Sequence, residues 1–167
     1  MRTGLGPEEP IVRLWKALKN GVPYVPLSGA SAAGAGASAL WLYRLSDGVE
    51  WVTEPSDTLF VRPEARQIWQ LVCEQKQGPS IITGPPGIGK SWALNYFLLQ
   101  LALQPVVVVL ELAASATRFV LQPDGAVQRY LYPDQPADAL ADKKTWYLFD
   151  PDEKDTQPLK VLSLIHI

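Results

Sequence analysis

The feature that most constrains this chain is a glycine-rich loop between a short apolar segment and a long apolar one. The loop reads Gly84-Pro85-Pro86-Gly87-Ile88-Gly89-Lys90-Ser91, a complete G-x-x-x-x-G-K-S pattern. Ile81 to Thr83 precede it and predict a strand, and the residues from Lys90 to about Leu103 predict a helix. A strand that runs through such a loop into a helix restricts the chain to α/β folds.

The residue types in this loop favour binding of a polyphosphate. Its glycines permit backbone conformations in which successive N–H groups face one anion, and the start of the helix adds a partial positive charge. Lys90 brings a full charge to the β- and γ-phosphates, and the Ser91 hydroxyl is a ligand for Mg²⁺. Pro85 and Pro86 stiffen the loop. A glycine turn before a buried helix is the alternative, but it leaves Lys90 and Ser91 unexplained.

We therefore expect residues 84–92 to bind a nucleoside triphosphate, ATP with Mg²⁺. The predicted binding residues, all contiguous, are Gly84, Pro85, Pro86, Gly87, Ile88, Gly89, Lys90, Ser91 and Trp92.

A second candidate element is an acidic residue at the end of a buried strand. Four large apolar residues, Trp146 to Phe149, predict the strand and Asp150 follows them. A carboxylate in that place holds Mg²⁺, usually through water, so Ser91 and Asp150 are the predicted metal ligands. We expect Glu153, or else Asp152, to act as general base for the attacking water. An acidic surface turn is the alternative for residues 150–153.

Other charged residues are weaker candidates for the same site. The continuous run Val106–Leu110 predicts a strand inside a parallel sheet covered by helices, and Glu111 at its end is a rival carboxylate. A hairpin is predicted around residues 123–125, and Arg118 and Arg129 flank it. Either arginine could approach the phosphates, although solvated strand positions explain both, and a partner subunit could supply the arginine instead.

The segment before the loop predicts a small, mixed extension. We expect a helix over residues 11–20, a Ser/Gly/Ala linker over 28–39, a hairpin of 40–45 with 49–52, a strand over 58–61 and a helix over 63–77. Within the linker, Gly34 to Ala39 matches a dinucleotide fingerprint by chance, because no strand precedes it.

Composition narrows the partners and the compartment. The net charge of −2 is spread along the chain and indicates neither nucleic acid nor an anionic membrane as partner. Cys73 is the one cysteine, which suits a reducing compartment, and we expect it to be a small buried hydrophobe. Residues 97–114 are interrupted by polar residues and predict no membrane span. With no secretory pattern at the start, we expect an intracellular protein, in the cytoplasm or nucleus.

Several segments together resemble the P-loop domain shared by Crinkler effectors and retrotransposon hot spot proteins. They are Thr58-Leu59-Phe60-Val61-Arg62-Pro63, the stretch Ile81 to Ser91, the helix aromatics Trp92, Tyr96 and Phe97, and the run Trp146 to Asp150. The resemblance implies an ATPase module that often precedes a nuclease-like domain, in an effector or selfish element of a eukaryotic microbe. Two departures are the lack of an effector-type leader and of room for a nuclease domain after residue 150.

The last residues, Leu162-Ser163-Leu164-Ile165-His166-Ile167, match the in-frame translation of a common sequencing adapter. We expect this tail to be foreign to the native protein, with a genuine final strand as the alternative. We predict an α/β three-layer P-loop NTPase sandwich, truncated after the strand that ends at Asp150. It would comprise an extension over 1–57, a nucleotide domain over 58–161 and the tail. The expected activity is ATP hydrolysis. A nucleotide-dependent switch and a small-molecule kinase are the alternatives.

Overall fold

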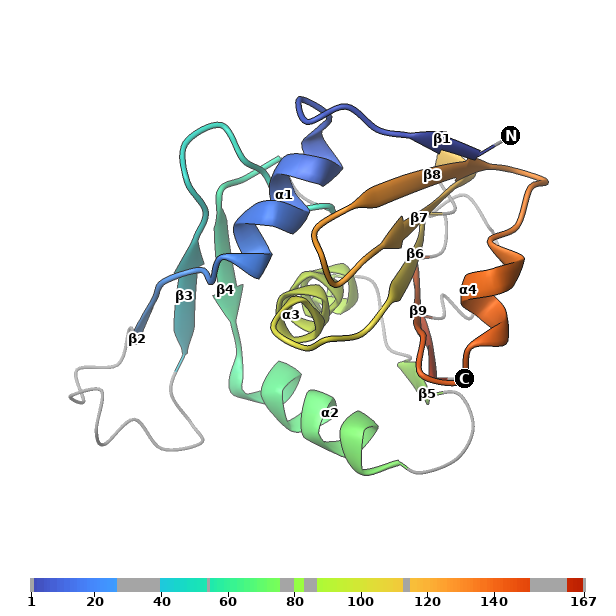
Figure 1. The fold of residues 1–167 in the computed structure, drawn as a ribbon. Coiled ribbons are helices and arrows are strands. Elements are labelled where there is room, and N and C mark those ends of the chain that lie inside the picture. The colour runs from blue at the N-terminus through green and yellow to red at the C-terminus, as the bar shows by residue number, and fades with distance from the viewer. Residues whose placement is uncertain are drawn as a thin grey trace.

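The chain has a mixed α/β fold, described here by a computed structural model (Figure 1). The structure describes residues 2–26, 40–53, 55–75, 80–82, 87–112, 115–150 and 162–166. Within these residues, four helices accompany one large and one small sheet. The linker predicted over 28–39 and its chance fingerprint lie outside the described residues.

The large sheet has the strand order β1-β8-β7-β6-β9-β10-β5. Its strands, in that order, are Arg2–Gly4, Val127–Leu131, Thr117–Leu121, Val108–Leu112, Trp146–Asp150, Leu162–His166 and Ser80–Ile82. The four strands β8-β7-β6-β9 form a mixed core, because β6 and β9 are parallel while β7 is antiparallel to both of its neighbours.

Three strands of this sheet run in the same direction. β6 and β9 are parallel, and β10 is antiparallel to both β9 and β5, so β5 is parallel to β9 and β6. The strand predicted inside a parallel sheet is β6, which is parallel to β9 but antiparallel to β7, so the sheet is mixed rather than parallel throughout. The carboxyl ends of β5, β6 and β9 therefore share one edge of the sheet, which is where open α/β sheets bind ligands.

Helices cover both faces of the large sheet. Helix α3 (Lys90–Ala102) lies against one face, and the short α4 (Ala137–Ala141) lies on the other (Figure 1). Because α3 is apolar on almost every side, it must be buried all round. It is accordingly central: nine of its residues are buried, from Ala93 to Ala102.

The N-terminal elements form a second layer over α3. They are α1 (Pro10–Lys19), α2 (Pro63–Glu74) and an antiparallel sheet of β2 (Tyr24–Pro26), β3 (Trp41–Arg44) and β4 (Thr58–Val61). Trp69 of α2 bridges the layers, with its ring centroid 5.3 Å from that of Phe97 and 5.5 Å from that of Trp146. The strand predicted over 58–61 is confirmed, and the helix predicted over 63–77 ends at Glu74.

The extension is also joined to the large sheet. β1 pairs with β8 at the sheet edge, and the buried Trp15 donates from its indole Nε1 to the carbonyl oxygen of Gln122 at 2.8 Å. No helix among the described residues is long and apolar enough to cross a membrane.

Two expectations about the residues before the glycine-rich loop are wrong. β3 does not form a hairpin with residues 49–52, because β2 and β4 occupy its two edges. Cys73 is exposed rather than buried. The buried side of α2 carries Trp69 and Val72, and Cys73 lies at the edge of that side, about 100° around the helix from Val72 and about 40° from Trp69.

Candidate functional site

The described part of the glycine-rich loop begins at Gly87, and the predicted residues Gly84, Pro85 and Pro86 lie outside the described residues. Gly87 and Gly89 have φ values of 77° and 95°, a left-handed conformation that side chains with a Cβ rarely adopt. This turn places Lys90 as the first residue of α3, where the unsatisfied backbone N–H groups of the helix start point outward.

The structure brings Ser91 and Asp150 together across 59 residues of sequence. The Ser91 hydroxyl lies 3.4 Å from Oδ1 of Asp150, which is longer than an ordinary hydroxyl–carboxylate hydrogen bond. Asp150 is the last residue of β9 and alternates with Leu148, which packs in the core with α3. Its side chain therefore points to the α3 side of the sheet.

This pair of oxygens suits one hard divalent cation. Two neighbouring oxygens of an octahedral Mg²⁺ stand about 3 Å apart, since each lies ~2.1 Å from the ion. Among the described residues no cluster of three or more His, Cys, Asp or Glu side chains could hold a metal. A two-residue protein contribution is typical of Mg²⁺, which completes its shell with phosphate oxygens and water.

Hydrogen bonds of Thr53, which precedes β4 in the sequence, join the first turn of α3 to the N-terminal layer. The Thr53 hydroxyl donates to the Ser91 carbonyl oxygen at 3.2 Å and accepts from Nδ2 of Asn95 at 2.8 Å. Asn95 is fully buried within α3. Sequence reasoning did not single out either residue, although an asparagine in an otherwise apolar helix is a signal that its amide needs a specific partner.

A cavity of about 540 Å³ opens beside Lys90, between α3 and the N-terminal layer. α3 and the glycine turn form one wall, and β4 and α2 form the other. Its lining comprises Leu40, Phe60, Val61, Arg62, Glu64, Ala65, Ile68, Ile82, Gly87, Ile88, Gly89, Lys90, Trp92, Ala93 and Tyr96. The predicted binding residues Gly87 to Lys90 and Trp92 thus share one hollow.

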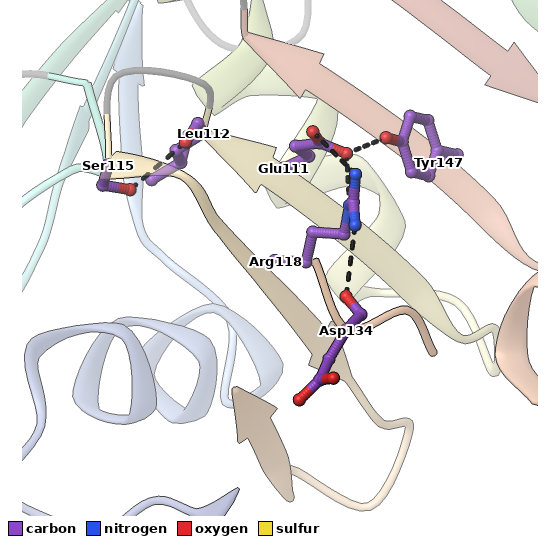
Figure 2. Close-up of polar contacts among 6 residues, drawn as sticks. All are labelled: Glu111, Leu112, Ser115, Arg118, Asp134 and Tyr147. Carbon is purple, nitrogen blue, oxygen red and sulfur yellow. Dashed lines mark hydrogen bonds and ion pairs between the residues drawn. The ribbon is translucent and has the colours of Figure 1, made fainter. Parts of the chain in front are cut away.

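Glu111 and Arg118 form a separate cluster with Tyr147 and Asp134 (Figure 2). Arg118 Nε lies 2.6 Å and Nη2 3.2 Å from the two Glu111 carboxylate oxygens, and Nη1 donates to the Asp134 carbonyl oxygen. The Tyr147 hydroxyl also donates to Glu111. Tyr147 lies between Trp146 and Leu148, whose side chains face α3, so it points to the α4 side.

The proton equilibria of this cluster reflect its contacts. Hydrogen bonding to Glu111 raises the pKa of the Arg118 guanidinium, so the arginine keeps its charge. Burial, reinforced by the hydrogen bond to the Glu111 carboxylate, raises the pKa of Tyr147 to about 12. Glu111, the alternative carboxylate for the metal site, is therefore held in a bidentate ion pair with Arg118.

Arg129 is not brought to Asp150. Arg129 lies in β8, three strands from β9, which is about 14 Å at ~4.8 Å per strand. The predicted bases Asp152 and Glu153 lie outside the described residues.

Comparison of the chain with protein-family models, with curated proteins and with solved structures finds no match. The resemblance to Crinkler effectors and retrotransposon hot spot proteins accordingly stays a prediction.

Proposed function

We propose that this chain binds a nucleoside triphosphate, ATP in the first place, together with Mg²⁺, and hydrolyses it with a P-loop NTPase domain. The observation that carries the proposal is the 3.4 Å approach of the Ser91 hydroxyl to the Asp150 carboxylate. It occurs at the start of α3, directly after a turn that contains two left-handed glycines. The three like-directed strands β5, β6 and β9 are the framework that such a site requires.

Each residue has a defined part in this proposal. The N–H groups at the start of α3 and the Lys90 ammonium bind the phosphate oxygens, because both carry positive charge at the same end of the helix. Ser91 and Asp150 hold Mg²⁺, which when bound neutralises charge that develops on the phosphates. Asp152 or Glu153 orients the attacking water and accepts its proton. The proposed reaction takes place inside the cell, because a chain with one cysteine can form no internal disulfide and suits a reducing compartment.

The test measures nucleotide affinity and phosphate release by the full chain with Mg²⁺. Lys90→Ala removes the positive charge at the helix start and is expected to weaken ATP binding by about tenfold or more, since a charge-assisted contact is worth ~1.5–3 kcal/mol. Lys143→Ala is the matched control, because this exposed lysine lies outside the site.

The same measurement separates the alternatives. Unchanged ATP affinity in Lys90→Ala would contradict the proposal. Tight binding without phosphate release would instead identify a nucleotide-dependent switch. Phosphate transfer that requires an added acceptor would identify a kinase.

A further inference from the structure

The cavity beside Lys90 is larger and more aromatic than phosphate binding requires. Its volume of about 540 Å³ lies within the ~300–1,000 Å³ typical of small-molecule sites. We infer that it takes the purine base of the bound nucleotide, with Phe60 and Trp92 as the stacking surfaces. This inference rests on the proposed function, because the phosphates anchor the ligand at Gly87–Lys90.

The position of the aromatic residues follows from the geometry of α3. Trp92 comes two residues after Lys90, and Tyr96 comes four residues later on the same helix face, about 6 Å further along the axis. A ligand whose phosphates occupy the start of the helix can therefore extend its sugar and base along this face. Both side chains line the cavity.

The opposite wall supplies a second ring. Phe60 of β4 has its ring centroid 6.2 Å from that of Trp92, with the ring planes inclined by 31°. Although it borders an apolar hollow, Phe60 is 46% exposed. A half-exposed phenylalanine at the mouth of a hollow gains most from a flat apolar ligand, because the ligand removes the ring face from water.

The chemistry of the lining favours a base over an aliphatic ligand. Ile68 and Ala65 of α2 add apolar lining, while Arg62 adds a donor group and Glu64 an acceptor group. A purine presents a wide aromatic face together with donor and acceptor atoms on its edge, and it stacks over a larger area than a pyrimidine.

The experiment compares ligands that share the phosphates but differ in the base. Binding of ATP, GTP, UTP and inorganic tripolyphosphate to the full chain is measured by calorimetry with Mg²⁺. We expect the purine nucleotides to bind roughly ten- to hundredfold more tightly than tripolyphosphate, the affinity ratio that corresponds to base–aromatic stacking. UTP should fall between them.

Two variants test which residues cause the tighter binding of purine nucleotides. Phe60→Ala and Trp92→Leu should each remove most of the purine advantage and leave tripolyphosphate affinity nearly unchanged. Tyr132→Ala is the matched control, because Tyr132 is a 70% exposed aromatic residue outside the cavity lining. ATP should also change the tryptophan fluorescence of the wild type more than that of Trp92→Phe. Circular dichroism verifies that the variants are folded.

The outcomes distinguish this inference from the function on which it rests. Lys90-dependent binding of tripolyphosphate with no additional affinity for ATP would overturn the base pocket and leave the phosphate site standing. A purine advantage that survives in folded Phe60→Ala and Trp92→Leu would also overturn it, because the base would then bind elsewhere. Failure of all four ligands to bind would remove both proposals.

Discussion

Glu111 and Asp150 lie near the carboxyl ends of the neighbouring parallel strands β6 and β9, yet they face opposite sides of the same sheet. In the register of β6 and β9, Glu111 lies beside Phe149 and Leu112 beside Asp150, so the two carboxylates are offset by one residue. That offset reverses the direction of the side chain. Asp150 meets the Ser91 hydroxyl at the start of α3, while Glu111 meets Arg118 and Tyr147 on the α4 side (Figure 2).

The difference teaches that an acidic residue at a strand end is not defined by its position alone. Glu111 is compensated by a guanidinium held in a bidentate contact, and the side chains of both residues are only about one-seventh exposed, at 16% and 14%. Asp150 stands instead beside a hydroxyl that can share a cation with it. We expect the first arrangement to stabilise the fold, whereas the second is the one on which the proposed metal–phosphate site rests.

The largest expected effect separates the two carboxylates by activity. Asp150→Asn should lower Mg²⁺-dependent phosphate release about tenfold to hundredfold, because it weakens a metal contact. Glu111→Gln should leave the rate per folded molecule nearly unchanged. Initial rates at saturating ATP and Mg²⁺ test both. An equal loss of rate in the two variants would break the comparison, since both faces would then serve the reaction.

The next effect concerns stability, for which Glu111 rather than Asp150 is expected to matter. Glu111→Gln should reduce the free energy of unfolding by about 1.5–3 kcal/mol, because the partly buried Arg118 loses its charged partner. Urea unfolding measures this change. The double variant Glu111→Gln/Arg118→Gln should lose less than the sum of its two single changes, since each single change already breaks the pair. Strict additivity would show that the ion pair contributes nothing.

A smaller effect sharpens the description of the α3 face. Thr53→Val should cost about 1–2 kcal/mol of unfolding free energy, because the buried Asn95 amide loses its partner and the Ser91 carbonyl loses a donor. Thr53→Ser is the matched control and keeps the hydroxyl. Thermal unfolding compares the two variants. If Thr53→Ser were destabilised and Thr53→Val were not, the methyl group rather than the hydrogen bonds would matter.

The smallest effect appears only at alkaline pH. The folded pKa of Tyr147, about 12, is raised above the ordinary value of 10, so its contribution to stability is complete below pH 10 and declines as pH rises toward 12. Over this window the stability of the wild type should therefore fall more steeply than that of Tyr147→Phe. The other buried tyrosines are present in both proteins, so their contributions cancel in the difference between the two stability curves. Parallel stability curves would contradict a specific role for the Tyr147 hydroxyl.

The sequence was informative wherever structure is decided locally. The glycine turn, the helix after it and the strand that ends at Asp150 follow from short patterns, and each is found in its expected place. That the Glu111 side chain points to the α4 side of the sheet was not predictable in the same way. Residues 106–110 are apolar at every position because both faces of the strand are covered, so no alternation shows which face a residue joins.

Errors arose where distant partners decide the structure. The two runs around Ser46-Asp47-Gly48 carry a typical hairpin signal, but β3 pairs instead with β2 and β4, which lie outside that local window. The Thr53–Asn95 contact spans 42 residues and could not be inferred from spacing. Only the polarity of Asn95 within α3 hinted that a partner existed.

The edge position of β1 has a consequence for how the molecule unfolds. Its pairing with β8, together with the Trp15–Gln122 hydrogen bond, ties the first elements of the chain to the hairpin of residues 117–131. α1 and α3 also bury side chains in one common core. The first elements of the chain therefore contribute to the same core as α3. We expect these elements to unfold together with the proposed nucleotide site in a single cooperative transition, and a chain that began at Thr58 would expose the apolar side of α3 to water.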